Sequence, residues 1–146
     1  MIILFSDIHL TDTQDRSTFP TEFFLKQLET AITSTTEDVT VVLLGDILEI
    51  LKSRQWLEAR VRPWEQCEPK HVETVAAIVK GIIDSNRDFF EGLRKLKQCH
   101  PSTRLEYIPG NHDRPINTEM GVTARVLLQN ELPLDQKNGS KFREVF

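Results

Sequence analysis

The fold of this chain is constrained most by a pattern that occurs three times: a short, largely apolar segment that ends at a small polar cluster. The segments are residues 2–5, 39–44 and 104–108. Residues 39–44, Val-Thr-Val-Val-Leu-Leu, are β-branched or apolar throughout, which indicates a buried strand. Residues 2–5 form a continuous apolar run and are expected to be buried on both faces of a sheet. The third segment is predicted to be a further short strand.

Helical periodicity separates and follows these segments. It predicts an amphipathic helix at residues 20–34 and a long helix at 71–98, which Gly81 is expected to bend or divide. A last helix is predicted at 119–129, whereas residues 47–70 follow no clear pattern. Strands that alternate with helices are typical of an α/β protein with parallel pairing. The predicted fold class is therefore α/β, layered, with central, mostly parallel strands flanked by helices.

Length and composition restrict the class of protein. The 146 residues suffice for one domain, and 39% hydrophobic with 27% charged residues is typical of a globular chain. The formal net charge of -4 argues against binding to nucleic acid mainly by phosphate neutralisation, although a local basic patch stays open. No apolar stretch approaches the roughly 20 residues that a membrane helix needs. With two cysteines and no signal-like segment, a cytoplasmic protein without a membrane partner is expected.

The first two polar clusters supply residues that bind cations. Asp7-Ile8-His9 follows the first strand, and side chains two residues apart on an extended chain project to the same side. Its carboxylate and imidazole could therefore reach one ion. Gly45-Asp46 closes the second strand, where glycine allows a sharp turn and the carboxylate could bridge two cations.

The third cluster, Gly110-Asn111-His112-Asp113, closes the third strand. Its asparagine offers a neutral amide oxygen to a metal, and its histidine could act as an acid or donate to a phosphate oxygen. Ligand sites of open α/β sheets lie at the carboxyl ends of strands, so the three clusters are expected in one cleft. Two divalent ions about 3.5–4 Å apart can clamp a phosphoryl group. We expect Mn²⁺ first and Fe, Zn, Ni, Co or Mg as alternatives, because mixed ligation selects poorly among them.

The three motifs in this order resemble the calcineurin-like metallophosphoesterases, whose pattern runs DxH, GDxx(D/E), GNH(D/E), H and GHxH. Glu49 fits the second motif, and the resemblance covers residues 7–113. It implies a metallophosphoesterase-type fold. The metal ligands that it implies are Asp7, His9, Asp46 as the residue bridging both ions, and Asn111. It also implies that His112 contacts the phosphate and protonates the leaving group, with Asp113 orienting its imidazole.

The chain departs from this family after the third motif, because no later histidine supplies the H and GHxH motifs. His71 and His100 are expected to be surface residues, and Asp12 and Asp15 to be solvated loop residues. Arg114 could hold a phosphate, and an ordinary surface arginine is an equally good interpretation.

We therefore expect residues 1–146 to be the N-terminal part of one metallophosphoesterase domain, of which only this half is present. The implied ligands make five protein bonds, whereas two ions usually need about eight. Residues 141–146 alternate polar and apolar side chains like the start of a strand. Such a fragment is expected to bind the second metal weakly, turn over little and expose apolar sheet that invites self-association.

Residues 47–103 form a long insertion between the second and third motifs, predicted to be mostly helical. Arginines interleave with Trp56 and Trp64 in its first part. The insertion could be a cap that selects the substrate or stacks on a base. The interpretation that we favour is an amphipathic cover whose tryptophans pack on the domain.

The predicted function is metal-dependent hydrolysis of a phosphomonoester or phosphodiester, with a phosphorylated substrate as the partner. One alternative is a catalytically incomplete fragment or a scaffold module that kept the fold, which metal analysis and an assay with bis-p-nitrophenyl phosphate and Mn²⁺ would distinguish. The other is a nuclease, which salt-dependent cleavage of DNA would reveal. The candidate substrate-binding residues are Asn111, His112 and Arg114.

Overall fold

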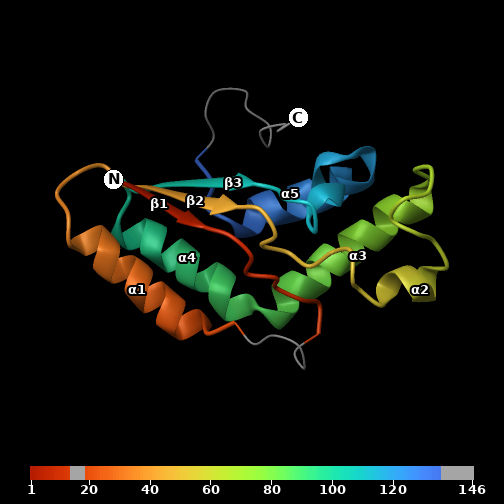
Figure 1. Ribbon diagram of the computed structural model, residues 1–146, viewed down its shortest axis with the longest axis horizontal. Coiled ribbons are helices and arrows are strands. Elements are labelled where there is room, and N and C mark those ends of the chain that lie inside the picture. The colour runs from red at the N-terminus through yellow and green to blue at the C-terminus, as the bar shows by residue number, and fades with distance from the viewer. Residues whose placement is uncertain (14–18, 136–146) are drawn as a thin grey trace.

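The computed structural model describes residues 1–13 and 19–135, which contain a three-stranded parallel sheet (Figure 1). The strands, in their order across the sheet, are β1 (Ile2–Phe5), β2 (Thr40–Leu44) and β3 (Arg104–Ile108). Ile2 is in register with Thr40, and Thr40 is in register with Arg104. The three strands therefore end at one edge of the sheet. The predicted α/β class, the strands and their parallel pairing are confirmed.

Five α-helices accompany the sheet in the described residues. They are α1 (Thr21–Thr33), α2 (Gln55–Ala59), α3 (Pro69–Ser85), α4 (Arg87–Cys99) and α5 (Val122–Glu131). Two 3₁₀ helices lead into α5, namely η2 (Arg114–Asn117) and η3 (Glu119–Gly121). Helices α1 and α4 run next to each other along the sheet, and α3 continues from α4 toward α2 (Figure 1). The helix predicted at residues 20–34 is confirmed, while the one predicted at 119–129 begins with the 3₁₀ turn η3.

The hydrophobic core lies between one face of the sheet and the helices. It includes Val41 and Leu43 of β2, Leu105 and Tyr107 of β3, and Phe89 of α4. Ile3 and Phe5 of β1 pack against this core, whereas Ile2 and Leu4 are 71% and 59% exposed. The expectation that residues 2–5 are buried on both faces is wrong. The reason is that the core covers only one face of β1, and Ile2 and Leu4 lie on the opposite face.

The long helix predicted at residues 71–98 is divided at Asn86 and not at Gly81. Asn86 leaves the helical region with φ -125° and ψ 36°. Its Nδ2 donates to the carbonyl of Thr11 at 2.8 Å and to a carbonyl in the last turn of α3. Gly81 stays inside α3, where an added Cβ would lie 3.1 Å from the Cβ of Asp12. The side chain of Asn86 thus both ends α3 and holds the loop that follows β1.

Asp12 is not the solvated loop residue that the sequence predicts. It is half-buried and accepts hydrogen bonds from Ser53 Oγ at 2.5 Å and Gln55 Nε2 at 3.0 Å. These bonds tie the loop after β1 to the start of α2. Asp15 and the strand expected at residues 141–146 lie outside the described residues.

His71 is only 2% exposed, so the expectation of a surface histidine is wrong. Its Nδ1 accepts from the backbone N–H of Glu68 at 3.2 Å, which satisfies an otherwise unpaired donor at the start of α3. Its Nε2 lies 3.1 Å from the carbonyl oxygen of Arg62 and must carry the proton, because a carbonyl only accepts. His71 therefore caps a helix, while His100 is partly exposed at the end of α4.

The two tryptophans of residues 47–103 differ sharply in exposure. Trp56 is 3% exposed, and its Nε1 donates to the carbonyl of Ile50 at 2.8 Å. Trp64 is 79% exposed. Trp56 packs inward as the cover interpretation requires, whereas Trp64 does not.

Candidate metal centre

Three loops meet at the carboxyl edge of the sheet. The N–H of Asp7 donates to the carbonyl of Gly45 at 3.2 Å, and the N–H of His9 donates to that of Asp46 at 2.9 Å. The N–H of Gly45 donates in turn to the carbonyl of Ile108 at 2.7 Å. These bonds fasten the loop after β1 to the loop after β2, and the latter to the end of β3. The structure thereby brings the three polar clusters together.

The backbone that presents these side chains is left-handed. Asp7, His9 and Asp46 have φ of 56°, 53° and 54°, and they are three of the four described residues other than glycine with positive φ. The expectation of an extended chain at Asp7 and His9 is therefore wrong. Left-handed φ is unfavourable for residues with a Cβ and is maintained only by surrounding structure, here by the bonds between loops. Such strain is concentrated at functional sites.

Asp7, His9 and Asp46 form the first of two overlapping groups and are here called the Asp-His-Asp triad. One potential ligand atom from each of them lies within 4.8 Å of the others. Asp7 is exposed, and the other two are partly exposed. Two carboxylates and an imidazole are a donor set that divalent transition metals accept.

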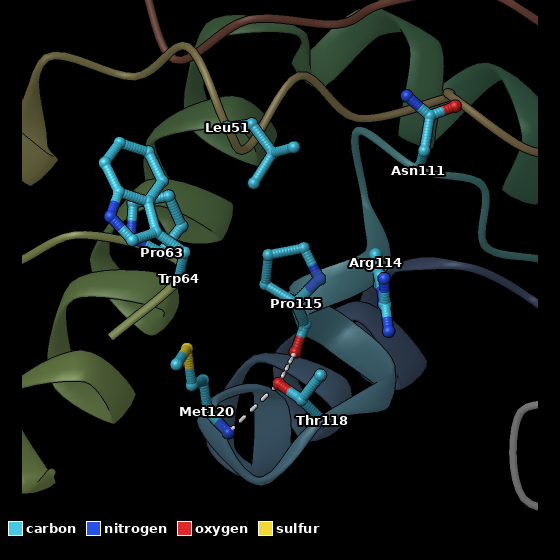
Figure 2. A pocket seen from close by; sticks show the side chains of 8 residues that line it. All are labelled: Leu51, Pro63, Trp64, Asn111, Arg114, Pro115, Thr118 and Met120. Carbon is cyan, nitrogen blue, oxygen red and sulfur yellow. Dashed lines mark hydrogen bonds between the residues drawn. The ribbon is translucent and has the colours of Figure 1, made fainter. Parts of the chain in front are cut away.

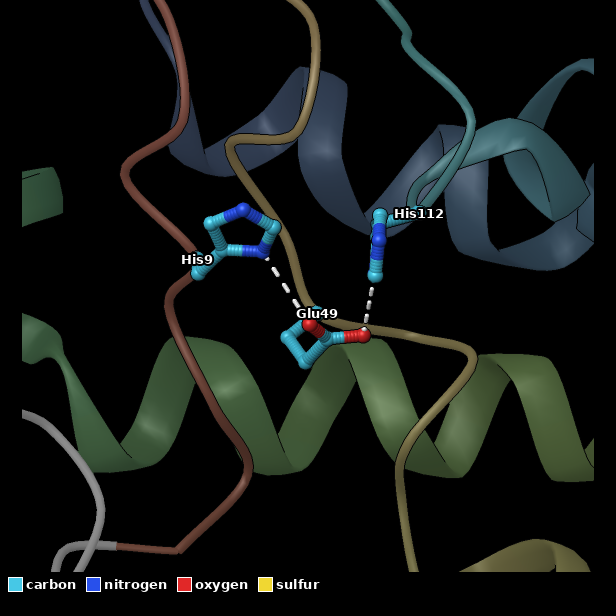
Figure 3. Close-up of side chains that lie close together, drawn as sticks. All are labelled: His9, Glu49 and His112. Carbon is cyan, nitrogen blue, oxygen red and sulfur yellow. Dashed lines mark hydrogen bonds and ion pairs between the residues drawn. The ribbon is translucent and has the colours of Figure 1, made fainter.

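His9 also belongs to a second group with Glu49 and His112, the His-Glu-His triad (Figure 3). Glu49 stands between the two imidazoles, with Oε2 at 3.0 Å from Nδ1 of His9 and Oε1 at 2.7 Å from Nδ1 of His112. The two rings are nearly perpendicular, with centroids 4.8 Å apart. One carboxylate therefore contacts a histidine from the first motif and a histidine from the third.

Glu49 is ionised at neutral pH although its side chain is only 6% exposed. Burial alone would raise the pKa of Glu49, but hydrogen bonds and positive charge from His112 and Lys52 outweigh burial and lower this pKa. An ionised carboxylate only accepts hydrogen bonds, so both histidines must donate through Nδ1–H. Nε2 of each ring is then the nitrogen left for a ligand.

The position of the proton on Nδ1 of His9 and His112 decides which triad suits a cation. Histidines that bind a metal through one nitrogen characteristically donate the other N–H to a carboxylate or carbonyl. Glu49 fills that role for His9, whose second nitrogen stays available, and Asp7 and Asp46 each offer an oxygen within 4.8 Å of a ring nitrogen of His9. The Asp-His-Asp triad is accordingly the better place for a cation, and Glu49 is the residue that orients the imidazoles.

Asp113 does not orient the imidazole of His112, contrary to the sequence-based expectation. Asp113 is fully buried, and its carboxylate accepts from the N–H of Ile47 at 3.0 Å, from the hydroxyl of Tyr107 at 2.7 Å and from the N–H of Gly110. Burial, followed by the negative charge of Asp113, raises the pKa of Tyr107 well above its usual value, so this hydroxyl remains a donor. Asp113 thus locks the loop after β3 to the loop after β2.

Two close contacts complete this lock. Oδ1 of Asp46 accepts from the N–H of His112 at 2.9 Å, which joins the second motif to the third. Gly110 lies against the same loop: an added Cβ would be 2.8 Å from Cα of Gly45 and would also clash with the carboxylate of Asp46. Glycine at position 110 is required by this approach of two backbones.

Asn111 and Arg114, which flank His112 and Asp113 in the sequence, are exposed and line a pocket of about 550 Å³ (Figure 2). Asn111 directly precedes His112, whose backbone is bonded to Asp46. The structure therefore brings Asp7, His9, Asp46 and His112 together. Asn111 and Arg114 line the pocket, and Asp113 is buried.

Glu49 is the residue of the candidate site that the sequence did not assign a role, since it entered only as a match to the second motif. A local signal was present. Glu49 is the single charged side chain in the run Ile47-Leu48-Glu49-Ile50-Leu51, and a carboxylate there must be paired if the run is buried.

Comparisons with protein-family models, curated proteins and solved structures found no match for this chain. Among the described residues, no helix combines the length and apolar character needed to cross a membrane.

Proposed function

We propose that this protein hydrolyses a phosphoester, a phosphomonoester or phosphodiester, with the help of divalent cations held at the Asp-His-Asp triad. The observation that carries the proposal is the pair of triads that share His9. One offers two carboxylates and an imidazole to a cation, and in the other Glu49 fixes which nitrogen each histidine presents. An arrangement that serves packing alone has no need to fix two tautomers beside one exposed and one partly exposed carboxylate.

The residues fit a cation on chemical grounds. Asp7 and Asp46 offer hard oxygen donors, and His9 offers Nε2, a set suited to Mn²⁺ and also to Fe, Zn, Ni, Co or Mg. Asn111 is the candidate that would add an amide oxygen for a second ion, with Asp46 between the two. Divalent ions at this place would polarise a phosphoryl group and acidify a water molecule.

The remaining residues act on the substrate and on one another. His112 holds Nδ1–H against Glu49, so a second proton on Nε2, carried by the imidazolium form, is the one that would pass to the leaving oxygen. Arg114 can donate to phosphoryl oxygens. Asp113 is a positioning residue, because its buried carboxylate fixes the loop that carries His112.

We infer from the order of the three motifs that the protein is a calcineurin-like metallophosphoesterase with the corresponding layered fold. The left-handed backbone at three cation-binding positions favours an enzyme over a scaffold that kept only the fold, since strain without a function is readily lost by substitution. Nothing in the described residues favours the nuclease alternative over hydrolysis of a smaller phosphoester.

The proposal is tested on the protein expressed from its complete reading frame. Its metal content is measured, and hydrolysis of bis-p-nitrophenyl phosphate and p-nitrophenyl phosphate is followed with added Mn²⁺. We expect turnover that depends on Mn²⁺ and disappears in Asp46→Asn. The matched control is Asp88→Asn, which changes an exposed carboxylate in the first turn of α4. Turnover that Asp46→Asn leaves intact, or that Asp88→Asn removes equally, contradicts the proposal.

A further inference from the structure

The pocket beside the triads has a wall that the proposed chemistry does not use. The wall is apolar and is built from two distant parts of the chain (Figure 2). Leu51, Pro63 and Trp64 come from the segment between the second and third motifs, and Pro115 and Met120 come from η2 and η3. A volume of about 550 Å³ is within the range of pockets that hold small organic molecules.

Trp64 is the most informative side chain of this wall. It is 79% exposed, whereas Trp56 of the same segment is buried and hydrogen-bonded. The close-up shows Trp64 and Pro63 on one side of the pocket, with Leu51 and Pro115 on the other side (Figure 2). An exposed indole offers a stacking surface for a planar ring.

The other end of the pocket is polar and carries positive charge. Asn111 and Arg114, which flank His112 and Asp113 in the sequence, line it, and none of the residues that line the pocket is acidic. Within residues 1–13 and 19–135, the guanidinium of Arg114 makes no ion pair with a carboxylate. The exposed guanidinium of Arg114 can therefore donate to the oxygens of an anion that enters the pocket.

We propose that the pocket selects phosphoesters whose alcohol portion is a planar aromatic group. The phosphoryl group would lie at Asn111 and Arg114, next to the triads, and the aromatic ring would stack on Trp64 against the apolar wall. This inference rests on the proposed function for the position of the phosphoryl group. It goes further by naming the substrate class and by giving the segment between the motifs the task of selecting it.

The experiment compares two ligands that cannot be hydrolysed, phenylphosphonate and methylphosphonate, by isothermal titration calorimetry with and without Mn²⁺. We expect phenylphosphonate to bind about 10-fold more tightly or better, in keeping with the contribution of aromatic stacking. Trp64→Ala should remove this preference and leave methylphosphonate binding unchanged, and Trp64→Phe should retain most of it. Arg114→Ala should weaken both ligands alike. Leu57→Ala is the matched control, because Leu57 is 63% exposed on α2 and does not line the pocket.

Three results would overturn the inference: the native protein binds neither ligand, it binds both with equal affinity, or Trp64→Ala weakens the affinity for both ligands equally. The proposed function fails separately. If the protein prefers phenylphosphonate through Trp64 but neither binds Mn²⁺ nor hydrolyses an aryl phosphate, the pocket stands as a binding site and the hydrolytic function does not.

Discussion

Replacing Glu49 by glutamine removes one acceptor from the His-Glu-His triad without changing the size of the side chain. The two carboxylate oxygens face Nδ1 of His9 at 3.0 Å and Nδ1 of His112 at 2.7 Å. Glutamine presents one oxygen and one NH₂ group, so one imidazole would meet a donor in place of an acceptor. His9 in that position must carry its proton on Nε2, the nitrogen needed for a cation, and His112 in that position would lose the Nδ1–H contact that supports its doubly protonated form.

The size of the effect follows from these contacts. Removing the partner that orients a metal-binding histidine costs about 10–100-fold in metal affinity or activity, which corresponds to about 1.4–2.7 kcal/mol. The protein also loses one hydrogen bond to a charged acceptor, worth about 1.5–3 kcal/mol, although relief from burying a carboxylate offsets part of this loss. We therefore expect a 10–100-fold weaker affinity for Mn²⁺ in Glu49→Gln and a free energy of unfolding lowered by about 2 kcal/mol or less.

Calorimetric titration with Mn²⁺ measures the affinity, and nitrogen-15 NMR of the imidazoles reports the tautomers. The control is Lys52→Gln, which removes the exposed partner that lies 3.2 Å from the same carboxylate. An exposed ion pair is worth about 0–1 kcal/mol, so this control should change the affinity far less. Native affinity together with unchanged tautomers in Glu49→Gln would refute the orienting role.

Three further predictions concern activity, packing and pH. In Mn²⁺-dependent hydrolysis, Asp46→Ala should abolish turnover, whereas His112→Ala should retain activity about 10²–10⁴-fold below native; equal, mild losses would contradict these roles. In urea denaturation, Gly110→Ala should lower the free energy of unfolding by about 1–3 kcal/mol, because the new Cβ meets backbone. Gly92→Ala, whose Cβ meets only a leucine side chain, should cost clearly less, and equal costs would count against the close approach. The pKa of Glu49 is lowered from 4.5, so the stability from its charged form is fully present above that pH and is lost as pH falls through the folded pKa. The difference in free energy of unfolding between native protein and Glu49→Gln should therefore shrink below pH 4.5. A difference that grows on acidification would contradict this prediction.

The sheet was predictable because its strands carry strong local signals. Residues 39–44 are apolar and β-branched, and the polar clusters mark where each strand ends. Exposure was less predictable, because burial depends on what packs against a strand. Ile2 and Leu4 are as apolar as Ile3 and Phe5, yet they lie on the outer side of an edge strand. The periodicity of apolar residues also could not predict where the long helix divides, because a hydrogen bond from Asn86 to the distant Thr11 accompanies the division.

The location of the candidate site followed from the motifs, but the partner of His112 did not. Adjacency suggested Asp113, yet neighbouring side chains point in different directions where a turn folds over another loop. Gly110 lets that turn approach the loop after β2, which buries Asp113 and leaves Nδ1 of His112 to Glu49, 63 positions away in the sequence. His71 was misjudged for a similar reason, because its bond to the carbonyl of Arg62 depends on how the insertion folds.

The most direct test is to locate the cation itself by anomalous X-ray diffraction at the manganese edge from crystals grown with Mn²⁺. A peak contacted by Asp7, Asp46 and Nε2 of His9, with Glu49 bonded to Nδ1 of both histidines, is the result that we predict. A second peak at Asn111 would mark the second ion. Manganese bound between His9, Glu49 and His112, or no manganese at either triad, would contradict the assignment on which the proposed function rests.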